Sequence, residues 1–182
     1  MPRIPFMPKN VIKSEELVAS MLARRGGRLW NLDRMLLHTP PLAQGWNTYL
    51  GAVRGELGVP TRLMELAICG VAVLNDCEYE FYHHAPEFMK AGGSAAQVEG
   101  LRSLARTMDD PALFDATEQA VLRLTLEMTR SVRVSDETFA AAREALGDTQ
   151  QMVELVGIIA TYNMVSRFLV ALDVEPEFYT GK

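Results

Sequence analysis

Apolar side chains recur every three or four positions from Glu15 onward, and alternating runs of β-branched residues are nearly absent. This period is typical of amphipathic helices rather than strands, so the sequence predicts an all-α fold built as a multi-helix bundle. Glycine and proline pairs mark the ends of the first helices. These breaks lie at residues 26–27, 38–41 and 58–61.

Cap residues divide the second half of the chain into further helices. Asn75-Asp76 supplies an N-cap signal for a helix that ends near Gly92-Gly93. The last helix, about Thr149 to Leu172, is almost wholly apolar, so we expect it at the centre of the fold or at a subunit interface. The other helices expected here are 95–107 after Ser94, 117–130, and one that Ser135-Asp136 caps and that runs to Gly147.

Residues 1–14 read as an irregular N-terminal arm, because they carry three of the nine prolines and no helical period. Nothing after them marks a linker long enough to divide the chain. We therefore expect one helical domain over residues 15–182.

Composition narrows the range of partners. The chain has 182 residues, 48% of them apolar and 23% charged, which is typical of a globular domain. A net charge of -5 without a dense basic run argues against nucleic-acid binding, since that depends on neutralising phosphates.

The N-terminus does not resemble a signal peptide, and no stretch of about 18 uninterrupted apolar residues occurs. We expect a cytoplasmic protein with a small-molecule substrate and no membrane partner.

The two cysteines, Cys69 and Cys77, are eight positions apart in one helical region. A continuous helix rises about 1.5 Å per residue, which would separate them by about 12 Å. They are not an evident disulfide pair.

The segment Cys77-Glu-Tyr-Glu-Phe-Tyr-His-His84 concentrates the groups that carry chemistry. On a helix, Cys77, Glu80 and His84 share one face at positions i, i+3 and i+7. The helix dipole favours a thiolate at Cys77, whereas the neighbouring carboxylates oppose one, so the direction of its pKa shift stays open.

Glu80 and His84 are one helical turn apart, so their side chains can hydrogen-bond. The pair either transfers protons in catalysis or is an ordinary surface ion pair. Glu65 stands among Leu63, Met64, Leu66, Ala67 and Ile68. A carboxylate carried into such surroundings must be paired or take up a proton, which suits a proton shuttle. The alternative is that Glu65 lies on the solvent side of its helix.

Further residues could bind a substrate. Tyr79, with Phe81 and Tyr82, is an aromatic set at helical spacing that more commonly packs than stacks on a ligand. Tyr162, Asn163 and Arg167 interrupt the apolar last helix and could bind a substrate carboxylate, although Arg167 fits a structural ion pair equally well. Glu65, Glu80 and His84 are weak evidence for a metal, and we expect none.

The order Glu65, Cys77, Glu80, His84, followed by Ala-Pro-Glu-Phe-Met-Lys-Ala-Gly, resembles the carboxymuconolactone decarboxylase and alkylhydroperoxidase D-like superfamily. The resemblance extends over about residues 29–178, through residues 32–40 and 162–168. It implies an all-helical fold that assembles as a homo-oligomer, a trimer or hexamer, with the site near a subunit interface and no cofactor.

Carried over by position, Glu65 matches the relay acid of the peroxidase branch, Cys77 its first cysteine and His84 its relay histidine. Glu80 stands where that branch has the second cysteine, and Tyr79 stands where it often has another histidine. A redox cycle between two cysteines is therefore impossible within this motif.

The catalytic set expected is Glu65, Cys77, Glu80 and His84. The preferred hypothesis is a decarboxylase- or isomerase-type enzyme that uses Glu/His proton transfer on a lactone or keto-acid substrate. The second is an antioxidant, peroxiredoxin-type activity through Cys77 alone. The third is an oligomeric ligand binder without catalysis.

Overall fold

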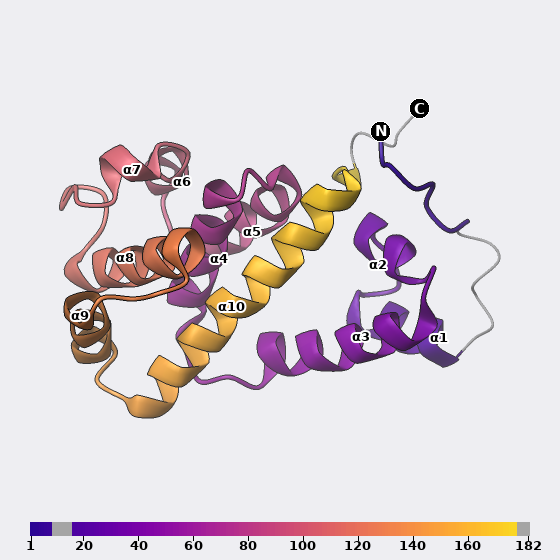
Figure 1. Ribbon diagram of the computed structural model, residues 1–182, viewed down its shortest axis with the longest axis horizontal. Coiled ribbons are helices and arrows are strands. Elements are labelled where there is room, and N and C mark those ends of the chain that lie inside the picture. Colours follow the sequence, from indigo (N-terminus) through magenta and orange to yellow (C-terminus); the bar gives the residue numbers. More distant parts are fainter. Residues whose placement is uncertain (9–15, 178–182) are drawn as a thin grey trace. The chain divides into compact units, whose positions relative to one another are not determined.

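The computed structural model describes residues 1–8 and 16–177. Within those ranges it has ten α-helices and no strand, which confirms the all-α prediction (Figure 1). The chain forms two compact units, Met1–Leu57 with Leu169–Lys182, and Gly58–Phe168. The expected division into an N-terminal arm and one domain stays a prediction, and residues 9–14 of that arm lie outside the described ranges.

The first unit contains α1 (Glu16–Arg24), α2 (Asn31–Leu36) and α3 (Pro40–Gly55), with α1 and α2 both packed on α3. Proline at the start of α3 suits a helix N-terminus, where its missing N–H is not needed. The fully buried Asp33 carboxylate accepts a hydrogen bond from the Trp30 amide at 2.9 Å and pairs with Arg25 at 3.2 Å. The buried charge of Asp33 is therefore paired within the first unit.

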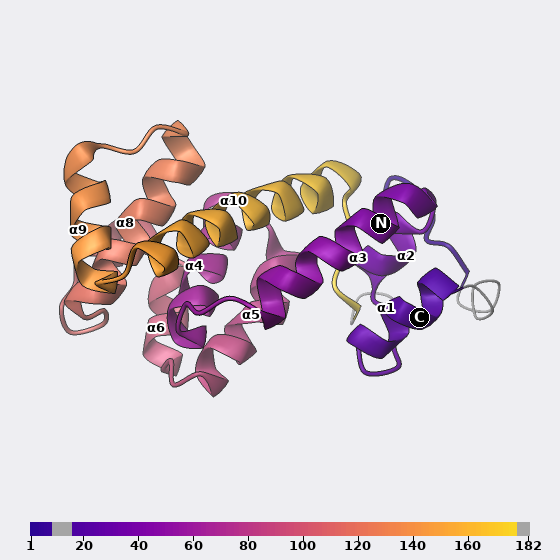
Figure 2. The same cartoon turned by 90° about the horizontal axis from the view of Figure 1, so that it is seen from below.

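The second unit holds α4 to α9 and α10 as far as Phe168, and α4 is its central element. The helix α4 contacts α5 and α8, and α8 in turn packs against α9 (Figure 2). Most of α4 is buried, from Met64 through Ala72. Their bounds are α4 (Thr61–Leu74), α5 (Glu78–Lys90), α6 (Ala95–Leu101), α7 (Leu104–Thr107), α8 (Ala116–Ser131), α9 (Asp136–Leu146) and α10 (Thr149–Leu172).

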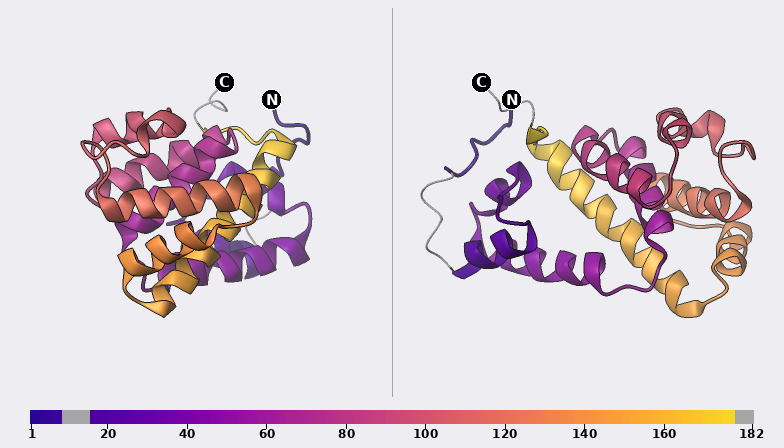
Figure 3. Two further views of the ribbon diagram at one scale, coloured as in Figure 1. Left: turned by 60° about the vertical axis from the view of Figure 1, so that its left-hand side comes forward. Right: turned by 180° about the vertical axis from the view of Figure 1, so that it is seen from behind.

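Two of the expected helix starts are confirmed by their caps. The Ser94 hydroxyl accepts the Gln97 amide at 3.1 Å, and the Ser135 hydroxyl accepts the Thr138 amide at 3.2 Å. The single helix expected over 95–107 is wrong, since the chain breaks into the short helices α6 and α7 (Figure 3). Apolar spacing continues across this break, so periodicity alone does not reveal it.

The turn between α4 and α5 differs from the expectation. Cys77, rather than Asn75 or Asp76, is the N-cap of α5. Asp76 takes a left-handed conformation, φ 51°, and its amide bonds to the Val73 carbonyl at 3.2 Å. The Cys77 amide bonds to the Ala72 carbonyl at 2.8 Å, which completes a Schellman-type end for α4. The residue that ends one helix therefore also begins the next.

By length and composition α10 could cross a membrane, a property it shares with core helices of soluble proteins. Leu155, Ile158 and Ile159 on it are fully buried, and so is the polar Ser166. The predicted bounds of this helix, Thr149 to Leu172, are confirmed.

Candidate active site

Glu65 and His84 form a hydrogen-bonded pair across the α4–α5 hairpin. The His84 Nδ1 atom lies 2.7 Å from Glu65 Oε2, although the residues are 19 positions apart. Glu65 is fully buried, so the solvent-exposed alternative is wrong, and the His84 side chain is 12% exposed. Because the buried carboxylate has this partner, its desolvation is offset by a strong hydrogen bond.

Glu80 lies on the other side of the same imidazole. The distance from His84 Nε2 to Glu80 Oε2 is 3.5 Å, which confirms the contact expected one helical turn apart. Glu80 is only 4% exposed, so this is not a surface ion pair. The ring of His84 therefore bridges two buried carboxylates, one from each helix.

A third helix borders this group. The buried ring of Tyr162 on α10 meets the His84 ring edge to face, with centroids 5.0 Å apart. Such a contact fixes the plane of the imidazole. Tyr162 was expected to bind substrate, and the structure places it beside the predicted proton shuttle.

Cys77 lies at the start of α5, one turn from Glu80. Backbone amides of Tyr79 and Glu80 hydrogen-bond to its sulfur, which favours the thiolate, but burial and the nearby Glu80 charge outweigh them. The pKa of Cys77 is raised to about 12. The direction left open by the sequence is thus upward.

Cys69 lies deeper in α4, where it is fully buried. Burial, then the charges of Glu65 and Glu80, raise the pKa of its thiol well above the ordinary value. Both cysteines are free, as their spacing indicated.

A pocket of about 250 Å³ opens beside Cys77. Among the described residues that line it there is one cationic side chain, Arg102. Its guanidinium lies 4.2 Å from the centre of the Phe81 ring and 3.4 Å from Glu78 Oε2. The lining residues are Ala72, Val73, Asp76, Cys77, Glu78, Phe81 and Arg102.

Of the residues that the sequence predicts in the site, only Cys77 lines this pocket. The acid–base groups Glu65, Glu80 and His84 lie behind it in the protein interior, and the residues expected to bind substrate do not line it either. Tyr79 is buried, with its ring centroid 4.6 Å from that of His83. The Asn163 amide donates to Thr129 Oγ1 at 3.0 Å. Its side-chain oxygen accepts from Asn75 at 3.0 Å and from Arg167 at 2.7 Å. Asn163 and Arg167 therefore serve contacts within the protein, which join the α4–α5 turn to α8 and α10.

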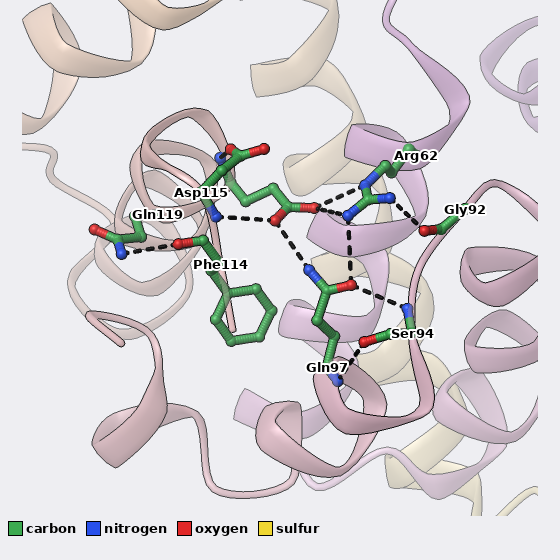
Figure 4. A network of polar contacts seen from close by, with 8 residues as sticks. Arg62, Gly92, Ser94, Gln97, Phe114, Asp115 and Gln119 are labelled. Atoms are coloured by element: carbon green, nitrogen blue, oxygen red, sulfur yellow. Dashed lines mark hydrogen bonds and ion pairs between the residues drawn. The ribbon is translucent and has the colours of Figure 1, made fainter. Parts of the chain in front are cut away.

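Arg62, one turn before Glu65 on α4, is the centre of a polar network that holds the hairpin in place (Figure 4). Its guanidinium pairs with Glu118 on α8 at 2.8 Å and donates to the Gly92 carbonyl just after α5. Glu118 is 2% exposed and also accepts from Gln97 at 2.9 Å. The start of α4 is thereby tied to the end of α5, which fixes the register that brings Glu65 to His84.

Sequence reasoning missed Arg102 and Glu78 as pocket residues. Arg102 follows α6 and lies 25 positions after Cys77, and no motif connects the two. In the sequence, Glu78 is one of the carboxylates beside Cys77, and nothing else about it indicates a place in a pocket. Within residues 1–8 and 16–177, no group of three or more His, Cys, Asp or Glu side chains is arranged to hold a metal ion.

Comparison with known proteins relates these features to a family. Residues 40–125 match the profile of the Carboxymuconolactone decarboxylase family, a range that includes Glu65, Cys77, Glu80 and His84. No curated protein sequence matches the chain significantly.

Solved structures show the same fold at low sequence identity. An uncharacterized peroxidase-related protein from Ralstonia eutropha JMP134, described as an alkylhydroperoxidase AhpD core, has a TM-score of 0.81 at 17% identity, covering 97% of this chain and 92% of its own. An uncharacterized peroxidase-related protein from Silicibacter sp. TM1040 has a TM-score of 0.74 at 16% identity, covering 100% and 92%. The debrominase Bmp8 in complex with 2,3,4-tribromopyrrole has a TM-score of 0.74 at 17% identity, covering 95% and 90%. The helices are thus arranged as in an AhpD core.

Proposed function

We propose that this chain, whose residues 40–125 match the model of the Carboxymuconolactone decarboxylase family, is an enzyme that transfers protons on a small organic substrate of the lactone or keto-acid type. The observation that carries the proposal is the His84 imidazole held between the buried carboxylates of Glu65 and Glu80, at 2.7 Å and 3.5 Å.

Each of the three groups has a distinct role. Glu65 accepts the Nδ1 proton of His84 and so sets the tautomer and the orientation of the ring. The Nε2 atom then exchanges protons with Glu80, which lies one turn from the pocket residue Cys77. Glu80 is the general acid–base and His84 the shuttle that restores its protonation state.

A decarboxylation fits this equipment without any redox partner. The bond between the substrate carbon and its carboxylate breaks, carbon dioxide leaves, and the electron pair stays on the carbon, delocalised into a neighbouring carbonyl. A proton delivered from Glu80 to that carbon completes the reaction, and His84 supplies the next proton to Glu80. Isomerisation uses the same pair, with removal of one proton and return to a different carbon.

A second candidate, a thiol peroxidase, is favoured by the position of Cys77 in the lining of the pocket. The thiolate would attack a hydroperoxide to form a sulfenic acid and an alcohol, and two equivalents of an external thiol would then restore the cysteine. A pKa of about 12 leaves little thiolate at neutral pH, and Glu80 occupies the place of a resolving cysteine. These two features favour the proton-transfer function.

Parallel assays separate the candidates. Purified protein would be tested against a panel of lactones and keto acids, and separately against hydroperoxides with dithiothreitol. We expect Glu80→Gln and His84→Asn to lower kcat/KM for the lactone or keto acid by about 100-fold or more, because each removes proton transfer. Glu99→Gln makes the same carboxylate-to-amide change at an exposed position of α6 and should leave turnover unchanged.

The two mechanisms predict opposite responses to loss of the thiol. The proton-transfer proposal would be overturned by two results together. Cys77→Ser would lose the turnover of hydroperoxide, and Glu80→Gln and His84→Asn would keep their activity on both panels unchanged. If neither panel is turned over and binding of a panel member is still measurable, the chain is a ligand binder.

A further inference from the structure

We propose that the pocket beside Cys77 binds a small planar molecule with a single carboxylate, and that Arg102 is the residue that selects for its negative charge. This inference rests on the proposed function only in taking the pocket as the substrate site. It adds the charge and shape of the ligand and a specificity-determining residue outside the family motif.

Three neighbouring segments build the pocket. The last turns of α4 contribute Ala72 and Val73, the Schellman turn contributes Asp76, and the first turn of α5 contributes Glu78 and Phe81. Arg102 closes it from the end of α6. At about 250 Å³ the pocket lies below the roughly 300–1,000 Å³ typical of drug-sized ligands, so it suits a small one.

Stacking on an aromatic ring prepares Arg102 for a planar partner. Its guanidinium lies 4.2 Å from the centre of the Phe81 ring, close enough for a stacked cation–π contact. A guanidinium held this way has a fixed plane, and its N–H groups form a fork that matches the two oxygens of a carboxylate. The partly buried side chain of Val73 adds an apolar surface to the same pocket, toward the body of the ligand.

The current partner of Arg102 is easily displaced. Glu78 Oε2 lies 3.4 Å from Arg102 Nη1, and the two side chains are 53% and 48% exposed. An exposed pair with this geometry contributes little stability. A ligand carboxylate that binds the guanidinium through two oxygens would therefore replace Glu78 as the partner of Arg102.

The remaining charges limit the ligand to one carboxylate. Asp76 and Glu78 place two negative charges in the pocket lining against the one positive charge of Arg102. Cys77, with a pKa of about 12, adds none at neutral pH. A second carboxylate on the ligand would face Asp76 and Glu78 without a cation of its own, so a dianion is disfavoured.

Calorimetry with three rigid probes tests the proposal on the intact protein. Benzoate carries one charge, benzamide has the same shape without charge, and isophthalate carries two charges. We expect benzoate to bind at least tenfold more tightly than either of the others. Arg102→Gln should weaken benzoate at least tenfold, and Glu78→Gln should strengthen it severalfold, because it frees the guanidinium.

A matched control makes the same charge change close by. Arg106 lies on α7, its guanidinium donates to the Ser103 hydroxyl at 3.1 Å, and it does not line the pocket. Arg106→Gln should change the dissociation constant of benzoate by less than twofold, and circular dichroism would confirm that all variants are folded.

Three results would overturn the proposal: no benzoate binding at millimolar concentrations, benzamide or isophthalate binding as tightly as benzoate, or an unchanged dissociation constant in Arg102→Gln. Repeating the titration with Glu80→Gln keeps this result separate from the catalytic proposal. If Glu80→Gln loses turnover, the catalytic proposal stands. If benzoate at the same time binds no more tightly than benzamide or isophthalate, only the assignment of Arg102 is refuted.

Discussion

The Nδ1 atom of His84 lies 2.7 Å from Oε2 of Glu65, and this contact joins the two helices of a hairpin through a buried carboxylate and an imidazole. Neither residue depends on solvent for its polar partner. The imidazole therefore has one nitrogen held for orientation and the other directed to Glu80 at 3.5 Å. This division of roles is what a proton shuttle requires.

Alkylation should reveal how strongly the site suppresses the Cys77 thiolate. With a pKa of about 12, about one thiol in ten thousand is ionised at pH 8, against roughly a quarter for an ordinary cysteine. We expect iodoacetamide to modify Cys77 at least about 100-fold more slowly than glutathione at pH 8. The rate, followed by peptide mass spectrometry, should rise about tenfold per pH unit up to pH 10.

Two comparisons isolate the cause. Glu80→Gln should speed the reaction at a given pH, because it removes a charge that raises the thiol pKa. Protein unfolded in urea should react at the ordinary rate. A plateau in the rate near pH 8 for the folded protein would contradict the prediction.

Arg62 should contribute far more to stability than an exposed arginine with equal geometry. Arg62→Met leaves Glu118, which is 2% exposed, as a buried charge without its cation. The expected loss is about 3 kcal/mol in the free energy of unfolding, measured with urea. Because Arg62 also binds the Gly92 carbonyl, the end of α5 should lose protection from hydrogen exchange in the same variant.

Arg123 provides the matched control. It lies 2.7 Å from Asp109, and the two side chains are 50% and 56% exposed. Arg123→Met should cost less than about 1 kcal/mol. Equal losses in the two variants would show that burial of Glu118 is not the source of the effect.

Glu127 should make stability depend on acid pH. Its carboxylate accepts hydrogen bonds from the Thr138 hydroxyl at 2.6 Å and the Ser135 amide at 2.7 Å, which lowers its pKa in the folded state. The unfolded state then binds a proton more readily, so this contribution is present above about pH 4.5 and is lost as the pH falls.

Urea unfolding of the parent chain and Glu127→Gln at several values between pH 7 and pH 3 measures this contribution. The difference in the free energy of unfolding should be largest at neutral pH and shrink toward pH 3. A difference that stays constant with pH would mean that ionisation of Glu127 has no role.

Local patterns in the sequence predicted most of the fold and part of the site. Periodicity revealed the helices, and the serines that precede two of them revealed the caps at Ser94 and Ser135. The apolar neighbours of Glu65 favoured its burial over a position on the solvent side, and helical spacing predicted the Glu80–His84 contact. All of these are properties of one helix at a time.

Relationships between helices could not be predicted in this way. The Glu65–His84 contact depends on the register of the α4–α5 hairpin, which the Arg62 network fixes from α8 and from the Gly92 carbonyl. The direction of the Cys77 pKa shift depends on burial, which raises the pKa, and on amide hydrogen bonds, which lower it, and only the structure shows which is larger. Arg102 enters the pocket because α6 ends beside α5, and its own surroundings in the sequence contain no sign of this.

The Schellman turn at Asn75-Asp76 limits the sequence changes that this part of the protein can accept. Since Cys77 both ends the turn and begins α5, one inserted or deleted residue would disrupt the hydrogen bonds from the Asp76 and Cys77 amides, displace α5 relative to α4 and carry His84 away from Glu65. Replacement of Asp76 by glycine or asparagine would preserve the left-handed backbone. We therefore expect homologues that keep the Glu65–His84 contact to differ in the amino acids of the turn but not in its number of residues.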